Sequence, residues 1–173
     1  MKRDIKWIID ITFIAFIITI LFSFGSQEIL KDIDVVFGIF IILIFIFIGV
    51  LFDIIGVAVQ SSNLTPFHAM ASKKVKNAKT AKKMLKNSAK VSSFCNDVIG
   101  DICNIISGSA GIIVSNSISI RYGFNITITT LIITSLIAAL TIGGKAFGKS
   151  IAVNKSEYIV SKVTKIIHIF GRN

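Results

Sequence analysis

The sequence predicts an all-α fold: a polytopic membrane helical bundle with about four transmembrane helices and two amphipathic helices on the cytoplasmic side. Of the 173 residues, 53% are hydrophobic and 16% are charged, whereas soluble domains have about 45–50% and about 25%. The mean hydropathy is +0.81. We find no Walker loop, dinucleotide fingerprint or HExxH motif, so we expect a membrane protein and no enzymatic activity.

Four stretches approach the roughly 20 apolar residues that cross a bilayer core. They are residues 7–24, 35–59, 91–114 and 126–142. The second is the most apolar; it carries one carboxylate, Asp53, and Gly56 is a candidate for a break in it. The first, interrupted by Asp10, also resembles a secretory signal. Its apolar run is long for a signal, so we favour an uncleaved helix; cleavage would leave three helices with the N-terminus outside.

The charged linkers predict the orientation of these spans. Eight lysines and no acid lie between the second and third spans, which places that loop in the cytoplasm. By alternation, both termini lie inside and the acidic loop 25–34 lies outside. We therefore expect a multi-pass cell-membrane protein. Its domains are an N-terminal helix and outer loop (1–34), a transmembrane domain (35–153) and an amphipathic juxtamembrane helix (154–173).

Two basic segments have helical apolar periodicity. We expect one helix over residues 65–85, capped by Thr65 with Pro66 at its first position. The tail repeats the pattern with an apolar stripe of Ile159, Val160, Val163, Ile166, Ile167 and Phe170. Both helices suit an inner leaflet with anionic headgroups. Their lysines lack interleaved aromatic residues, so we expect no nucleic-acid partner. His68 and His168 are interpreted as surface residues.

The third span carries the unusual chemistry. Drawn as an α-helix, it gathers small and polar residues on one face, namely Ser93, Asp97, Gly100, Asp101, Asn104, Gly108 and Gly111. One interpretation is tight helix packing with satisfied polar groups. However, a charge at membrane depth costs at least about 2.5–3.5 kcal/mol, so the two carboxylates need a cavity, a cation, a proton or a basic partner. Cys95 and Cys103, about 12 Å apart along such a helix, are expected to be buried thiols.

Several polar groups are expected at similar membrane depth. At 1.5 Å per residue, Asp97 lies roughly 9 Å and Asp101 roughly 15 Å from the inner end of the third span. Asp53, residues 60–63 and residues 143–145 reach the same inner half. Together they predict an inward-open polar pocket. Its carboxylate, amide, hydroxyl and carbonyl oxygens suit a hard cation such as Mg²⁺.

Three motifs resemble the transmembrane domain of the cyclin M / CorC (CNNM, CorB) family of magnesium transport proteins. Gln60-Ser-Ser-Asn-Leu-Thr65 is similar to the family's F-S-x-S-E-T break before a basic surface helix. Cys95-Asn-Asp-Val-Ile-Gly100 is similar to G-N-x-L-V-N. Gly144-Lys-Ala-Phe-Gly-Lys-Ser-Ile-Ala152 is similar to G-E-x-x-P-K-S-x-A. The order and spacing agree over about residues 35–170.

The resemblance implies a homodimer with an inward-facing Mg²⁺ site. Ser61 and Asn96 match family cation-site residues, Asn63 replaces a serine, and Gly144 keeps a glycine. With the residues expected from depth, the candidate ligands are Ser61, Asn63, Asn96, Asp97, Asp101, Asn104 and Gly144. Lys145 stands at the family glutamate and Gly148 at its proline. The family's nucleotide-binding CBS domains are not present in the sequence, so a separate CBS-bearing chain is a candidate partner.

Two functional hypotheses follow from the charges. In the first, Asp97 or Asp101 supplies the negative charge, and the protein transports or binds a divalent cation. In the second, Lys145 pairs with Asp53 or Asp97, which neutralises the pocket. The protein is then a non-transporting membrane partner or assembly subunit.

Overall fold

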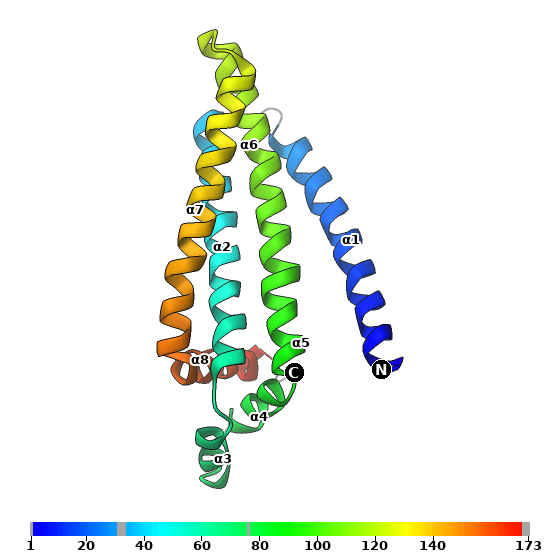
Figure 1. Ribbon diagram of the computed structural model, residues 1–173, viewed down its shortest axis with the longest axis vertical. Coiled ribbons are helices and arrows are strands. Elements are labelled where there is room, and N and C mark those ends of the chain that lie inside the picture. The colour runs from blue at the N-terminus through cyan, green and yellow to red at the C-terminus, as the bar shows by residue number, and fades with distance from the viewer. Residues whose placement is uncertain (1, 31–33, 76, 171–173) are drawn as a thin grey trace. The chain divides into compact units, whose positions relative to one another are not determined.

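The computed structural model describes residues 2–30, 34–75 and 77–170, and the side chains of residues 2–4, 6, 26–30 and 170 lie outside the description. Lys76, Lys31, Asp32 and Arg172, which contribute to the predicted charge pattern, are therefore not placed. The described residues form an all-α fold, as predicted (Figure 1). The long helices are α1 (Lys2–Leu30), α2 (Val35–Ser61), α6 (Asp101–Tyr122) and α7 (Ile126–Asn154).

Shorter helices connect and follow them. These are α3 (Thr65–Ser72), α4 (Ala78–Lys86), α5 (Ser88–Ser93) and α8 (Ser156–Phe170). A π-helical segment, Phe94–Gly100, joins α5 to α6 in one continuous run. Four candidate membrane spans result within the described residues: Trp7–Gly25, Val35–Ser61, Ser88–Tyr122 and Ile126–Asn154. Helices satisfy their own backbone hydrogen bonds in lipid, and the chain is a multi-pass helical membrane protein.

The chain divides into two compact units, and α2 and α7 contribute residues to both. The first unit contains Met1–Gly49 and Gly100–Gly143. Within it α1 contacts α6. A methyl group added at Gly49 would lie 3.2 Å from the Cys103 Cβ, and one at Gly111 would meet the Ile137 side chain. These glycines therefore allow α6 to pack closely against α2 and α7.

The connection between α6 and α7 explains where both helices end. Gly123 has a φ of 69° and follows the last residue of α6, as in helices that end with a left-handed glycine. Asn125 then caps α7, because its Oδ1 accepts hydrogen bonds from the amides of Thr127 (3.0 Å) and Ile128 (3.3 Å). Nearby, Arg121 forms an exposed ion pair with Asp34 at 3.4 Å.

Many hydroxyl groups of the third span are satisfied inside their own helix. Ser107, Ser115 and Ser119 are buried and donate to the carbonyls of Cys103, Gly111 and Ser115, at 2.8, 2.6 and 2.9 Å. Such bonds to the preceding turn remove the need for an outside partner. These three serines are not among the residues predicted for the polar face, and they need no partner from another helix. Cys95 and Cys103 are buried free thiols, as predicted.

The second unit contains Val50–Ile99 and Gly144–Asn173. Its apolar core joins α2, α3, α4, α7 and α8 and consists of Ala58, Val59, Phe67, Ala81, Leu85, Ala152 and Val160. Added methyl groups at Gly144 and Gly148 would lie 2.9 Å from Val50 and 2.7 Å from Ile54. These two glycines, one turn apart, therefore let α7 pack closely against α2.

The single helix predicted over residues 65–85 is wrong, because the chain turns between α3 and α4. Lys74 has a φ of 56°. The Lys74 amide donates to the Ala71 carbonyl and the Val75 amide to the Met70 carbonyl, both at 3.1 Å, which is the Schellman pattern of a helix end. The turn allows Phe67 of α3 and Leu85 of α4 to enter one core. Leu64, not Thr65, is the N-cap, without a side-chain cap bond.

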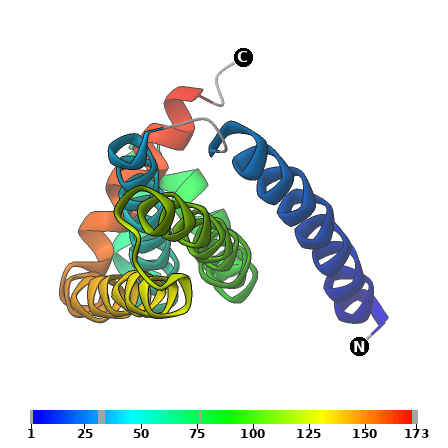
Figure 2. The same ribbon diagram turned by 90° about the horizontal axis from the view of Figure 1, so that it is seen from above.

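The residues of the predicted stripe of the tail helix differ in their burial within the chain. After α7 the chain turns at Lys155 and α8 runs transverse to it (Figures 1 and 2). Val160 and Thr164 are fully buried, whereas Ile166 and Ile167 are exposed; the Phe170 side chain lies outside the described residues. The buried face is set by α4, which contacts α8, and it includes a threonine that apolar periodicity does not select.

Candidate functional site

Three polar or small residues follow one face of α2 at helical spacing. Asp53, Gly56 and Gln60 are three and four residues apart, so they occupy neighbouring turns of that face. The break expected at Gly56 is wrong, because α2 continues through this residue to Ser61. Gly56 instead makes room: a methyl group there would overlap the side-chain oxygen of Asn96.

Asn96 of the π-helical segment is held by a short chain of hydrogen bonds. Its Nδ2 donates to the Ser92 Oγ at 3.3 Å, and this hydroxyl donates to the Gln60 Oε1 at 3.2 Å. These two bonds engage the amide nitrogen of Asn96 and the side-chain oxygen of Gln60 on α2. The carbonyl side of the same amide is consequently turned toward Gly56.

Buried acceptor oxygens are left unmatched at this place. Asp53 is 4% exposed, and its Oδ2 and the Asn96 Oδ1 are buried without a hydrogen-bond partner. Ser62 Oγ, further along the same unit, is in the same state. A buried polar atom without a partner costs about 1–3 kcal/mol, and more when it is charged. Asp53 lies one turn before Gly56 on α2, and the Asn96 oxygen of the π-helical segment lies against Gly56. Unmatched acceptors on these two neighbouring segments favour a positively charged ligand.

The π-helical segment changes which residues of the third span share a face. Its wider hydrogen-bond ring, from residue i to i+5, shifts the register relative to an α-helix. Asp97, Asp101 and Asn104 are exposed, whereas Gly100 and Gly111, predicted for the same face, are buried. The predicted seven-residue face is therefore wrong in part. Asp97 accepts a hydrogen bond of 2.5 Å from the Ser93 hydroxyl.

The remaining predicted ligands have different surroundings. Ser61 and Asn63 are exposed at and just beyond the end of α2. Gly144 is half-buried against Val50, where it serves close helix packing. Of the seven candidate ligands, Asn96 therefore lies in the buried polar network of α2 and the π-helical segment.

The donor set of this candidate site consists of oxygen atoms. No group of three or more His, Cys, Asp or Glu side chains gathers anywhere in the described part of the chain. A site at Asp53 and Asn96 would offer one carboxylate and one amide oxygen. This set suits a hard cation that keeps several of its waters, as Mg²⁺ commonly does, better than a transition metal.

Sequence reasoning missed the roles of Gly56 and Ser92. The signal for Gly56 was present, because a glycine within a long run of bulky apolar residues also indicates a close approach by another group. No comparable signal marked Ser92, which is one of many serines in the chain. Its role depends on the turn that brings α5 beside the end of α2.

We compared the chain with known protein families, curated proteins and solved structures. The chain matches no protein-family model, no curated protein and no solved structure.

Proposed function

We propose that this membrane protein binds a divalent cation, with Mg²⁺ as the first candidate, at Asp53 and Asn96 and transports it across the bilayer. The observation that carries the proposal is the pair of buried, unpartnered oxygens on facing helices of one unit. The ion is the substrate, and the four candidate spans provide the membrane-crossing scaffold. The resemblance of three motifs to CNNM/CorC transmembrane domains supports the same ion.

Burial of the Asp53 carboxylate has an energetic cost. Asp53 lies within a membrane-spanning helix and is almost fully buried, where an isolated charge is costly. A cation at Asp53 would neutralise this charge and would also provide the Asn96 oxygen with a partner. The Asn96–Ser92–Gln60 chain would hold the amide in position before the ion arrives.

We further propose that the basic loop faces the cytoplasm and that two copies form a dimer. The eight lysines over residues 73–90, up to the start of the third span, support this orientation. On α6, Asn104 and Asn116 are exposed in the single chain. Amide side chains at membrane depth favour contact with another helix over contact with lipid, and a second copy would supply that helix.

The direct test measures Mg²⁺ binding by the purified full chain and Mg²⁺ flux into proteoliposomes. Asp53→Asn keeps the shape of the side chain and removes its charge. We expect this variant to weaken Mg²⁺ binding by about tenfold or more, which corresponds to about 1.4 kcal/mol, and to reduce flux accordingly. Asn96→Ala should have a similar effect, because it removes the second oxygen.

Asp10→Asn is the matched control, because Asp10 is an exposed carboxylate within the first span. It should bind and transport as the wild type does. If Asp101→Asn abolishes flux and Asp53→Asn does not, α6 supplies the charge and the Asp53 assignment is wrong. If the wild type neither binds nor transports Mg²⁺, and Lys145→Glu creates binding, the self-neutralised pocket is the correct alternative.

A further inference from the structure

A cleft of about 560 Å³ lies between the turn after α3 and the helix α8. Its volume falls within the about 300–1,000 Å³ typical of small-molecule sites. Met70 and Val75 line it from one side, and Ser161, Lys165, His168 and Ile169 line it from α8. All these residues belong to the second unit, and none of them is among the candidate cation ligands.

The two walls of the cleft are tied together by Asn77, which also lines it. Its Nδ2 donates to the Ser161 carbonyl at 3.0 Å and to the Thr164 Oγ1 at 3.2 Å. Thr164 is fully buried and Asn77 is 7% exposed. The Schellman turn at Lys74 positions Val75 on the opposite side. The cleft is therefore formed before a ligand binds, which lowers the entropic cost of binding.

The polar end of the cleft is basic. Lys165 and His168 are three residues apart and lie on the same side of α8. Lys165 is exposed and His168 is half-buried, so both nitrogen-bearing groups are accessible. Among the described residues, no acidic one lines the cleft, and the adjacent turn carries the exposed Lys73 and Lys74. This arrangement favours an anion such as a phosphate group.

The other end of the cleft is apolar and continues into an exposed apolar surface. Met70, Val75 and Ile169 line it, and Ile166, Ile167 and Ile169 on α8 are all at least 45% exposed. A free phosphate has no apolar group that could contact these residues, whereas a phospholipid has both a phosphate and an apolar chain. A basic helix with an exposed apolar face is typical of a helix that lies at a membrane surface.

We propose that this cleft binds one anionic phospholipid, with its phosphate at Lys165 and His168 and the start of its acyl chain along Met70, Val75 and Ile169. This is a discrete site, distinct from the general attraction between a basic surface and an anionic leaflet. Binding would join α8 to the α3–α4 turn and to the bilayer at once. The proposal does not depend on the cation site.

Native mass spectrometry of the full chain with added phosphatidylglycerol tests the proposal. We expect one bound lipid, and Lys165→Gln should weaken its binding by about tenfold through loss of a charge-assisted contact. His168→Leu should also weaken it, through loss of the ring N–H donor. Lys162→Gln is the matched control: Lys162 is exposed on the same helix but lies over the Tyr158 ring at 5.4 Å and does not line the cleft. It should change the affinity by less than about twofold.

A second pair of variants tests the apolar wall. Ile169→Ser should weaken lipid binding by about threefold through loss of apolar contact, and Ile166→Ser, exposed to a similar degree but outside the lining, should not. Equal losses in Lys165→Gln and Lys162→Gln, or equal binding of phosphatidylcholine, would overturn the proposal. Displacement of the lipid by inorganic phosphate alone would assign the cleft to free phosphate and also overturn it.

Discussion

Gly56 and Asn96 show how a missing side chain positions a polar one. The Asn96 carbonyl occupies the space that a Cβ on Gly56 would fill, while its amide nitrogen is engaged by Ser92. The orientation of Asn96 thus depends on two residues that contribute no atom to the candidate ligand set. A change at Gly56 should therefore affect the site without removing any proposed ligand.

We expect Gly56→Ala to displace Asn96, to weaken Mg²⁺ binding by about tenfold and to cost about 1–3 kcal/mol of stability through overpacking. Thermal unfolding in detergent and Mg²⁺ titration measure the two effects. Gly143→Ala is the matched control, because an added methyl group there meets nothing within 4 Å; it should be neutral or slightly stabilising. If Gly56→Ala binds Mg²⁺ as the wild type does, the position of Asn96 against Gly56 is not required for the cation site.

Between helices, the closeness of α7 and α2 depends on Gly144 and Gly148. Methyl groups at these positions would meet Val50 and Ile54, so larger residues would push the two helices apart. This close approach explains why a glycine suits position 148. A proline inside this helix would remove a backbone hydrogen bond, whereas glycine keeps α7 continuous.

Gly148→Leu should lower the unfolding temperature in detergent, because overpacking a well-packed helix contact costs about 1–3 kcal/mol. Gly143→Leu introduces the same side chain on the same helix at a position that is exposed and open. It should leave the unfolding temperature close to that of the wild type. If both variants melt at the same temperature, close packing at Gly148 does not stabilise the protein.

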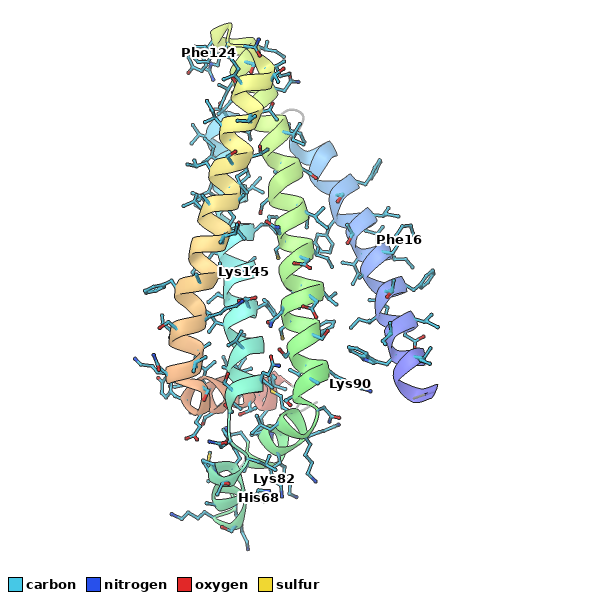
Figure 3. All side chains as sticks on the ribbon, in the orientation of Figure 1. Phe16, His68, Lys82, Lys90, Phe124 and Lys145 are labelled. Atoms are coloured by element: carbon cyan, nitrogen blue, oxygen red, sulfur yellow. The ribbon has the colours of Figure 1, made fainter. Side chains whose placement is uncertain are left out.

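For the whole chain, the distribution of charge predicts a topology that can be measured. Lys82 lies on α4, in the basic loop, and Phe124 lies in the short connection before α7; Figure 3 labels both. The span Ser88–Tyr122 separates them in the sequence. The two positions should therefore be on opposite sides of a membrane.

In a Cys95→Ser, Cys103→Ser background, Lys82→Cys should react with an impermeant thiol reagent only from the cytoplasmic side. Phe124→Cys, whose native side chain is 61% exposed, should react only from the outer side. Intact cells and inverted vesicles distinguish the two. Reaction of both positions from one side would contradict a membrane crossing by the third span, and exchange of the two sides would reverse the proposed orientation.

Much of the fold was predictable because the bilayer imposes a simple rule. Four apolar runs of sufficient length had to form helices, and the structure confirms all four. The burial of Cys95 and Cys103 followed from the same reasoning. The candidate site was predictable only in part: Asn96 was selected as a ligand, Asp53 was included in the expected pocket but not among its ligands, and Ser92 was not selected.

The amino-acid pattern alone established a multi-pass helical protein with its bases gathered in one loop and the tail, because hydropathy and charge act on each segment independently of its neighbours. Helix contacts established the rest. The turn at Lys74, the π-helical register at Asn96 and the buried face of α8 each depend on which surface packs against the segment. A local sequence pattern does not contain that information, since the decisive partners, such as Gly56 for Asn96 and Thr164 for Asn77, lie 40 and 87 residues away.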